Sequence, residues 1–193
     1  MDLTIIIFLS GGLFLGWSLG ANDAANVFGT AVGTRMVQFK TAALVCSVFV
    51  ILGAIISGAG TTETLGKLGA INALPGAFAV CVAAGLSVYI MTKFGLPVST
   101  TQAIVGAIVG WNIYTGSSIN IKILFTILAT WVLCPIIAAL IAMLFFILTK
   151  QILRKCNWHL FRLDAYTRTA LLLVGAFGAY SLGANNIANV MGV

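Results

Sequence analysis

The sequence has very few charged residues. Only 7% of its 193 residues are Asp, Glu, Lys or Arg, whereas 61% are hydrophobic. A soluble domain carries about 25% charged residues, so this composition excludes a soluble globular domain. The mean hydropathy is +1.12, and the apolar runs approach the roughly 20 residues that one membrane span requires. The sequence therefore predicts an all-α, polytopic integral membrane protein, which we expect in the plasma membrane.

Residues that carry enzyme chemistry are also scarce. The single histidine, His159, lies in a basic segment, and we expect an interfacial or loop position for it. The four cysteines form no Cys-x-x-Cys pair. Cys46, Cys81 and Cys134 lie in apolar runs, where a cysteine is usually a small buried hydrophobe. No side chain is recognisable as a nucleophile beside an oriented base, so we predict that the protein is not an enzyme.

The positive charge does not point to a nucleic-acid partner. The formal net charge is +6, and the ten Lys and Arg residues cluster in the predicted loops. This distribution is what the positive-inside rule expects of a membrane protein. The N-terminus lacks both a basic region and a small-residue cleavage pattern, so we expect the first span to belong to the mature protein.

A polar motif interrupts the first apolar run. Gly-Ala-Asn-Asp-Ala-Ala-Asn-Val at 20–27 follows an uncharged run over 3–19. In a helix, Asn22 and Asn26 would share one face, with Asp23 beside them. A carboxylate inside a membrane span costs roughly 2.5–3.5 kcal/mol on insertion scales, so it marks a functional site by default. Because Gly20 and Gly29 flank the motif, we expect the helix to break between Gly20 and Asn26 and to line a cavity there.

The same motif returns near the C-terminus. Ser18–Val27 matches Ser181–Val190 at eight of ten positions, with an offset of 163 residues. Paired glycine-interrupted apolar segments at matching positions indicate a transporter whose site lies at the interface of two repeats. We therefore divide the chain into a first transmembrane repeat (1–148), a basic inter-repeat loop (149–168) and the incomplete start of a second repeat (169–193).

A second polar break lies in the middle of the chain, at 95–102. It contains three hydroxyls and an amide after Pro97, with sequence Gly-Leu-Pro-Val-Ser-Thr-Thr-Gln. If a helix begins at Ser99, its free N–H groups and the positive end of its dipole form an anion site. The alternative is a plain N-cap, a position that serine and threonine favour.

The basic residues suggest a topology. If the segment Ala103–Tyr114 and its flanks cross the membrane, Lys67 and Lys122 fall on one side, with Asp2 and Glu63. The other eight fall on the opposite side: Arg35, Lys40, Lys93, Lys150, Arg154, Lys155, Arg162 and Arg168. This split puts the N-terminus outside, with five crossings before the second repeat, which would make the repeats inverted. A Ser-Thr-Thr tip at mid-membrane fits a re-entrant hairpin better, and the sequence leaves both alternatives open.

Three segments carry a resemblance to a known family. GANDAANVFGTAVGT (20–34), PVSTTQAIVGAIVG (97–110) and GANNIANV (183–190) resemble the inorganic phosphate transporter (PiT) family of secondary carriers. The paired Gly-Ala-Asn-Asp/Asn motifs are more specific together than either is alone. The family has a second Pro-Val-Ser-Thr-Thr segment in its second half, and this chain lacks one. We therefore expect the chain to be a fragment, a partial gene model or a split half.

The resemblance implies an inverted-repeat carrier of inorganic phosphate, coupled to sodium or protons, that acts as a homo-oligomer such as a dimer or with a missing second half. It implies no cofactor other than a sodium ion. The expected substrate-binding residues are Asn22, Asp23, Asn26, Ser99, Thr100, Thr101, Asn185, Asn186 and Asn189. The candidate sodium ligands are Asn22, Asp23, Asn26 and Asn186, because amide and carboxylate oxygens suit a hard cation. Spacing alone implies only an anion and a cation.

Two kinds of alternative function stay open at this point. The first is a sulfate permease of the same fold. The second belongs to a different class, namely an anion channel or a structural membrane subunit. Repeats with broken helices favour a carrier, because they suit alternating access.

Overall fold

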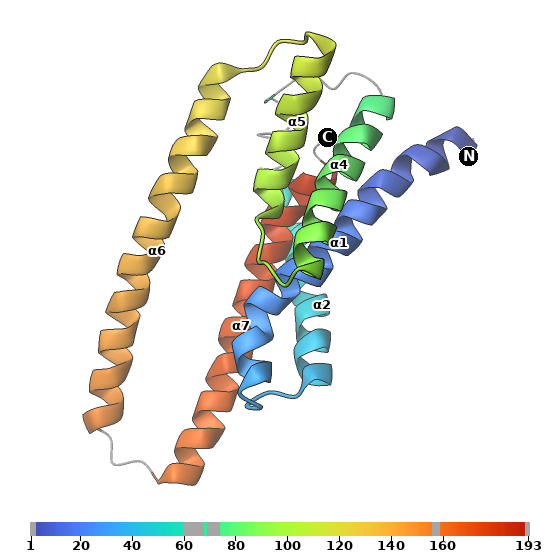
Figure 1. Cartoon of the computed structure of the whole chain (residues 1–193). Coiled ribbons are helices and arrows are strands. Elements are labelled where there is room, and N and C mark those ends of the chain that lie inside the picture. Colours follow the sequence, from blue (N-terminus) through green and yellow to red (C-terminus); the bar gives the residue numbers. More distant parts are fainter. Residues whose placement is uncertain (1–2, 60–67, 69–73, 156–158, 192–193) are drawn as a thin grey trace.

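The computed structural model describes residues 3–59, 68, 74–155 and 159–191. Within these ranges most residues belong to helices, which short connections join (Figure 1). Their bounds are α1 Leu3–Gly33, α2 Phe39–Ser57, α4 Leu74–Lys93, α5 Thr100–Thr115, α6 Ile121–Lys155 and α7 Leu160–Met191. Five of them, all except α5, are long and apolar enough to cross a membrane. The predicted all-α, multi-pass membrane protein is thereby confirmed.

Helices α4 and α5 form a hairpin. They lie side by side and antiparallel, and the loop over 94–99 connects their lower ends (Figure 1). Gly95 takes a left-handed conformation in this loop, with φ +69°, which a glycine adopts without strain. Near the open end, the Trp111 ring packs on Gly76, where an added methyl group would approach it to 2.9 Å. The hairpin is therefore a packed unit with its tip at residues 94–99.

The hairpin tip reaches the middle of α1. The side chain of Asn22, which lies far from both ends of α1, bonds to the Thr92 hydroxyl at 3.0 Å. The α4–α5 pair thus enters the molecule and returns without crossing it. The hairpin is the alternative that the structure adopts, with Lys93 at its tip. Helix α4 is long and apolar enough to span a membrane, so the number of crossings before α7 stays a prediction.

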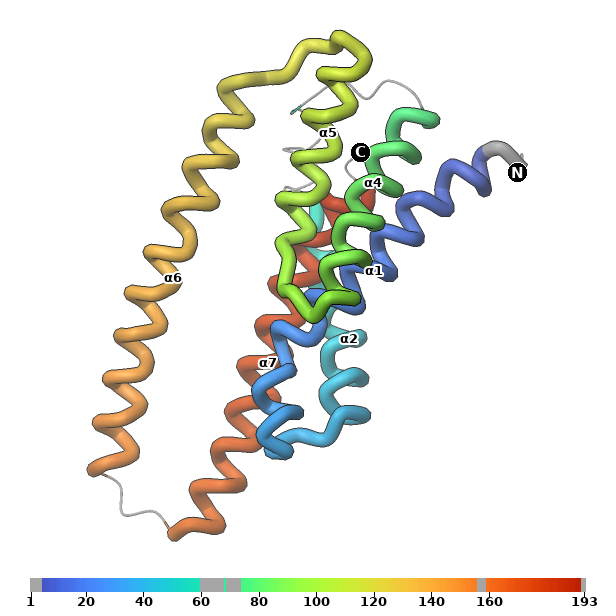
Figure 2. Tube along the Cα trace, in the orientation of Figure 1, coloured from blue at the N-terminus to red at the C-terminus, as the bar shows by residue number. Residues whose placement is uncertain are grey.

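Helix α1 is continuous through its polar motif, so the break predicted between Gly20 and Asn26 is wrong. Helix α7 is equally continuous through the repeated motif. The alanines within the motif favour helix, and the polar side chains bond to neighbouring helices instead of competing for their own backbone. Helix α1 nevertheless changes direction along its length (Figure 2). The break predicted at Pro97–Thr101 is confirmed, since α4 ends at Lys93 and α5 begins at Thr100.

Helices α1 and α7 pack against each other and are antiparallel. Gly12, near the start of α1, faces Val190 near the end of α7. Phe28, near the end of α1, lies against Gly175 in the first half of α7. The first helix of each repeat therefore has the opposite orientation in the structure. This geometry confirms the inverted relation for these two helices.

Helix α2 packs closely along α7. A side chain on Gly183 would collide with the backbone carbonyl of Val50, and one on Gly53 would collide with that of Tyr180. Helix–helix contacts in membranes favour such small residues, because they let the backbones approach. A buried cluster between α1, α2 and α7 continues this contact and includes Phe28 and Ala179. A second cluster, which includes Leu15 and Ile104, fixes the hairpin to α1.

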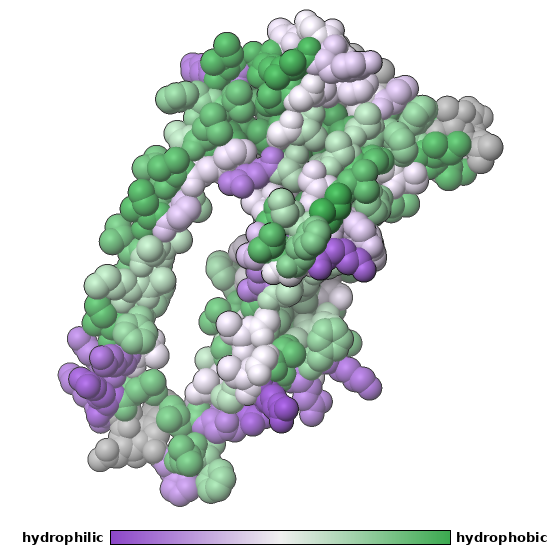
Figure 3. All heavy atoms as spheres, viewed as in Figure 1, coloured by the Kyte–Doolittle hydropathy of each residue, from purple (hydrophilic) through white to green (hydrophobic). Residues whose placement is uncertain are grey.

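None of the residues of helix α6 is buried, although Ile123, Leu124, Ile127 and Trp131 in its first half pack against the cluster that contains Leu15 and Ile104. Figure 3 shows apolar side chains along it and an opening between it and the rest of the molecule. Cys134 on this helix is exposed, so the expectation that it is buried is wrong, whereas Cys46 and Cys81 are buried as predicted. Cys156 lies outside the described residues.

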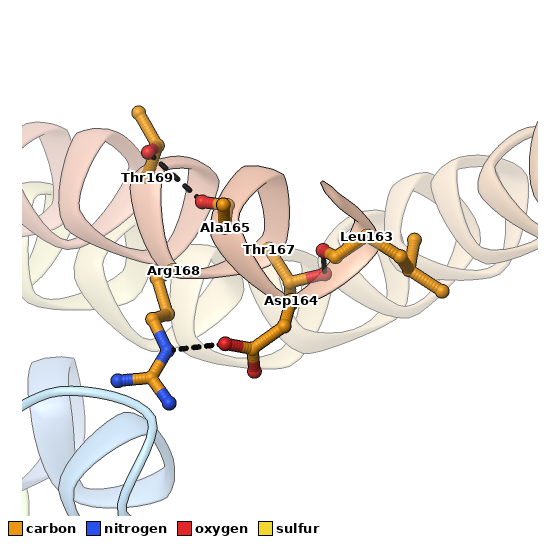
Figure 4. Close-up of polar contacts among 6 residues, drawn as sticks. All are labelled: Leu163, Asp164, Ala165, Thr167, Arg168 and Thr169. Carbon is orange, nitrogen blue, oxygen red and sulfur yellow. Dashed lines mark hydrogen bonds and ion pairs between the residues drawn. The ribbon is translucent and has the colours of Figure 1, made fainter. Parts of the chain in front are cut away.

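The basic segment 149–168 is mostly helical, so the prediction that it forms a loop is wrong. Helix α6 extends to Lys155 and α7 starts at Leu160, because lysine and arginine are good helix formers. Arg168 pairs with Asp164 one turn earlier on α7, at 2.8 Å (Figure 4). His159 stacks on Phe161, with ring centroids 5.4 Å apart. The remaining division of the chain into repeats stays a prediction.

Candidate functional site

The carboxylate of Asp23 lies where α1, α5 and α7 meet. Its Oδ2 atom accepts a hydrogen bond from Asn186 Nδ2 at 2.9 Å and one from Thr100 Oγ1 at 3.2 Å. Asp23 is only 8% exposed, and Thr100 and Asn186 are buried as well. A buried carboxylate needs such donors, because an unpaired charge in an apolar medium is strongly unfavourable. The three side chains therefore form the polar centre of the molecule.

Asp23 and Asn186 are also equivalent positions of the sequence repeat. They are 163 residues apart, which is the offset between the two motifs. A residue touches its own repeat mate only near the axis that relates the two repeats. The pseudo-two-fold axis therefore passes between these side chains. Transporters with inverted repeats place their substrate and ion sites at this kind of interface.

A chain of hydrogen bonds links this pair to the hairpin a second time. Asn189 Nδ2 donates to Asn186 Oδ1 at 2.8 Å and to Thr101 Oγ1 at 3.2 Å. Because Thr100 bonds to Asp23, adjacent threonines at the start of α5 are tied to the two different helices. The network thus fixes the hairpin tip against both α1 and α7.

Asn22 has two alternative amide orientations. In one, its Nδ2 donates to Thr92 Oγ1 at 3.0 Å. The other amide atom then lies 3.0 Å from the Val98 carbonyl oxygen and 3.2 Å from Asp23 Oδ1. If that atom is oxygen, three oxygens converge, an arrangement that a cation between them would stabilise. If it is the NH2 group, Asn22 donates to both oxygens and accepts from Thr92. The second orientation satisfies both ends of the amide and is the one expected without a cation, whereas the first would place three oxygens around a bound cation.

A cavity of about 480 Å³ lies beside this network. It collects most of the predicted substrate-binding residues, and Val27, Pro97, Val98 and Leu182 complete its wall. The predicted residues that line it are Asp23, Asn26, Ser99, Thr100, Thr101, Asn185 and Asn186. Asn22 and Asn189 do not line this cavity and instead hold its wall through hydrogen bonds. The Val98 carbonyl was not anticipated, because side-chain patterns do not report backbone oxygens.

Helix α5 begins at this cavity. Ser99 is its N-cap, and Ser99 Oγ accepts from Gln102 N at 3.3 Å. The capping role is thus confirmed, and it does not exclude an anion site. The first N–H groups of a helix have no partner within the helix, and they lie at the positive end of the helix dipole. The start of α5 therefore presents donors and positive potential to the cavity.

A second cavity, of about 440 Å³, adjoins the first. The two share Ser99, Thr101 and Asn185 in their linings. Thr126, Thr130 and Cys134 of α6 form part of its wall. These three positions recur every four residues, a spacing that puts them on one helical face and that could have been noticed in the sequence. The polar surface around the hairpin tip thus continues toward α6.

The fold and the site together define a class of protein. Antiparallel membrane helices carry equivalent polar motifs that meet on the repeat axis beside a re-entrant hairpin, which is the architecture of an inverted-repeat secondary transporter. Residues 19–167 match the profile of the Phosphate transporter family. This match covers more than half of the chain, so the chain belongs to that family. The family is one of transporters and not of enzymes, as predicted.

Several relatives have names of the same kind. A Thermococcus kodakarensis protein named as a phosphate permease is 40% identical over 166 residues, covering 80% of this chain and 41% of the relative. One from Pyrococcus furiosus is 36% identical, with 80% and 40% covered. One from Haemophilus influenzae is 32% identical, with 74% and 36% covered. The chain thus spans about two fifths of the length of these curated relatives.

One solved structure has the same fold. "The sodium-dependent phosphate transporter" superposes with a TM-score of 0.82 over 99% of this chain and 66% of its own, at 23% sequence identity. At that identity the likeness establishes the arrangement of the helices. The re-entrant hairpin and the crossing of α1 with α7 are therefore features of a transporter fold.

Proposed function

We propose that this chain forms part of a secondary transporter that moves inorganic phosphate and is coupled to sodium. The observation that carries the proposal is the cavity beside Asp23, where a carboxylate, three hydroxyls, three amides and a helix N-terminus converge. Membership of the Phosphate transporter family supports the substrate. The residues predicted for the site line this cavity or hold its wall, and their roles in binding are part of the proposal.

The donors around the cavity suit a tetrahedral oxyanion. Ser99 and Thr101 line it with hydroxyl groups, and the α5 N-terminus adds backbone donors. The Asp23 carboxylate adds discrimination between anions. A carboxylate has about four acceptor positions, and Thr100 and Asn186 fill two of them. With a sodium ion on Oδ1, a position remains that can accept from the P–OH of phosphate, whereas sulfate has no proton to donate near neutral pH.

The oxygens around Asn22 suit a sodium ion. The Asn22 amide oxygen, Asp23 Oδ1 and the Val98 carbonyl are hard ligands of the kind that alkali and alkaline-earth cations prefer. Asp23 supplies the negative charge. Val98 belongs to the hairpin tip, directly before Ser99. A cation held by these oxygens would therefore tie the hairpin to α1 and order the hydroxyls that contact phosphate, which couples the two binding events. Asn26 and Asn186, the other proposed sodium ligands, line the same cavity as Asp23.

Uptake of labelled phosphate into proteoliposomes that contain the full-length protein tests this proposal. We expect saturable uptake that an inward sodium gradient drives and that excess sulfate does not inhibit. Uptake driven only by a proton gradient would replace sodium with protons as the coupling ion. Equal transport of sulfate would overturn the substrate assignment, and a non-saturating conductance would indicate a channel. Assembly into a homo-oligomer stays a prediction, and its test is the mass of the purified protein.

A further inference from the structure

Most of the basic residues gather at one end of the molecule. The end of α1, the start of α2, the end of α6 and the start of α7 all lie at the lower end in Figure 1. The basic residues there are Arg35, Lys40, Lys150, Arg154, Lys155, Arg162 and Arg168. Such an excess marks the cytoplasmic side of a membrane protein, so we call this the cytoplasmic end.

Along α7, the second cavity lies farther from the cytoplasmic end than the cavity beside Asp23. The cavity beside Asp23 contacts α7 from Leu182 to Asn186, whereas the second cavity contacts it from Asn185 to Asn189. Because α7 starts at the cytoplasmic end, this shift moves the second cavity away from that end by nearly one helical turn.

The hairpin and α6 show the same displacement. The cavity beside Asp23 includes Pro97 and Val98 at the hairpin tip, whereas the second cavity reaches Val105 within α5. Its wall on α6 lies between Thr126 and Cys134, in the half of that helix away from the cytoplasmic end. This half of α6 and the open end of the hairpin lie in the upper part of Figure 1. The two cavities therefore extend toward opposite sides of the membrane.

The two cavities meet at groups that can donate to an anion. Ser99, Thr101 and Asn185 line both of them. Ser99 Oγ accepts from Gln102 N, and Thr101 Oγ1 accepts from Asn189 Nδ2. Since a hydroxyl group is both an acceptor and a donor, each of the two can still donate its proton. An anion can thus contact the same hydroxyl donors from either cavity.

Helix α6 adds polar groups to the second cavity only. The hydroxyls of Thr126 and Thr130 donate to the carbonyls of Lys122 and Thr126, at 2.9 Å and 2.8 Å. Their oxygens can still accept hydrogen bonds from water in the cavity. The cavity volume of about 440 Å³ has room for a small anion and several waters, each of which takes about 30 Å³. A wet, uncharged wall of this kind suits the passage of an ion.

We propose that the second cavity is the extracellular half of the phosphate pathway, with the Thr126–Thr130–Cys134 face of α6 as its outer wall. Phosphate moves between the two cavities on the donors of Ser99, Thr101 and Asn185. The inference rests on the proposed transport of phosphate and adds the part of the pathway beyond the site at Asp23.

The native thiol of Cys134 provides the first test. Cys134 is exposed, whereas Cys46 and Cys81 are buried. The full-length protein is treated from the extracellular side with a membrane-impermeant thiosulfonate that adds a sulfonate group to a thiol. We expect phosphate uptake to fall at least about fivefold, because the added negative charge repels the anion at short range. Reaction from the cytoplasmic side alone would reverse the two half-pathways and overturn the inference.

Two variants control this measurement, and each is compared with its own uptake before treatment. Cys134→Ser should be insensitive to the reagent, which assigns the effect to that thiol. The double variant Val132→Cys with Cys134→Ser moves the thiol to an exposed position on the opposite face of α6. It should also be insensitive, because a thiol in lipid does not form the reactive thiolate. Equal inhibition of this double variant, or no reaction of Cys134, would overturn the inference.

The second test narrows the cavity. Thr130→Phe places a ring in the second cavity, and Val132→Phe places the same ring on the opposite face of α6. We expect Thr130→Phe to lower phosphate uptake at least about tenfold, because a narrower passage hinders the ion. Val132→Phe should leave uptake unchanged. Equilibrium binding of labelled phosphate should stay unchanged in both, because no described residue of α6 lines the cavity beside Asp23.

Failure of this inference is distinguishable from failure of the proposed function. Absence of phosphate uptake by the unaltered full-length protein would overturn the proposed function. Normal uptake by both the unaltered protein and Thr130→Phe would overturn the extracellular half-pathway alone. Loss of phosphate binding as well as uptake in Thr130→Phe would place α6 at the binding site itself, and would likewise overturn the inference.

Discussion

The two polar motifs are nearly identical in sequence but not in environment. Asn22 on α1 is buried and contacts the hairpin, whereas its mate on α7, Asn185, is exposed. The reverse holds for the second pair, since Asn189 is buried against the hairpin and its mate Asn26 is exposed. The one hairpin in the described residues therefore contacts one member of each pair. The pseudo-two-fold axis predicts a second hairpin-like element that contacts Asn26 and Asn185.

The motifs also differ in charge. The position on the axis is Asp23 in α1 and Asn186 in α7, and the two side chains are hydrogen-bonded at 2.9 Å. An amide beside a carboxylate donates to it, whereas a second carboxylate would repel it. Asn186 thus has nearly the same shape as Asp23 but carries no charge. This asymmetry supports the proposal that the site binds one sodium ion.

The largest effect is expected from Asn186→Asp, which removes the difference in charge. The change replaces a donor with a second buried carboxylate next to Asp23. Leaving a buried charge uncompensated costs about 3–5 kcal/mol, so phosphate uptake at neutral pH should fall more than about a hundredfold. The measurement is labelled phosphate uptake, with Asn186→Gln as a control of similar polarity. Unchanged uptake by Asn186→Asp would show that the two positions do not touch.

The second largest effect is expected on stability at Gly183, and its equivalent in the first repeat, Gly20, serves as the comparison. A methyl group on Gly183 collides with the Val50 carbonyl, whereas one on Gly20 meets nothing within 4 Å. We expect Gly183→Ala to lower the free energy of unfolding of the 193-residue chain by about 1–3 kcal/mol. Gly20→Ala should leave it unchanged or raise it by up to about 1 kcal/mol. Thermal unfolding in detergent measures both. Equal losses would mean that a helix equivalent to α2 lies against Gly20 as well.

A smaller effect is expected from the threonines that tie the hairpin to the two motifs. Thr100 donates to Asp23 on α1, and Thr101 accepts from Asn189 on α7. Valine has nearly the same shape and lacks the hydroxyl. A hydrogen bond to a charged group contributes about 1.5–3 kcal/mol, so Thr100→Val and Thr101→Val together should weaken phosphate uptake at least about tenfold. Thr100→Val should have the larger share. Normal phosphate uptake kinetics in both variants would show that Ser99–Thr101 only cap helix α5.

The smallest effect is expected far from the axis. Asp164 and Arg168 form an exposed pair on α7 (Figure 4), and exposed helical pairs of this spacing contribute about 0.3–0.5 kcal/mol. Asp164→Asn should therefore change the unfolding free energy by no more than that and leave phosphate uptake unchanged. A marked loss of uptake would show that the basic end of α7 takes part in transport.

Much of the fold follows from the sequence for physical reasons. The lengths of the apolar runs predict the membrane helices. Pro97 and the hydroxyl residues after it predict the helix break before α5, which begins at Thr100. The repeat placed Asp23 and Asn186 in equivalent positions, and the structure brings them into contact. The continuity of α1 was missed because glycine and asparagine are weak helix formers in isolation. In the folded chain, tertiary hydrogen bonds to Asn22 and Asp23 satisfy the motif without unwinding it.

Other features could not be read from residue patterns. The re-entrant path of α4 and α5 depends on where the hairpin tip packs, which is set by contacts far apart in the sequence, such as Thr92 with Asn22. The Val98 carbonyl is a backbone group and carries no sequence signal. The helical extension of α6 to Lys155 was missed because a basic segment was equated with a loop.

Asp23, the carboxylate on the repeat axis, is proposed to bind the coupling cation. The most direct test measures labelled phosphate uptake against sodium concentration for the unaltered protein and for Asp23→Asn, which keeps the size and removes the charge. We expect sodium to stimulate phosphate uptake by the unaltered protein and Asp23→Asn to lose this stimulation. If the mutant instead keeps sodium dependence but admits sulfate as a competitor, Asp23 acts only as the acceptor for the phosphate proton. Uptake by Asp23→Asn with unaltered rate, sodium dependence and sulfate exclusion would contradict the account.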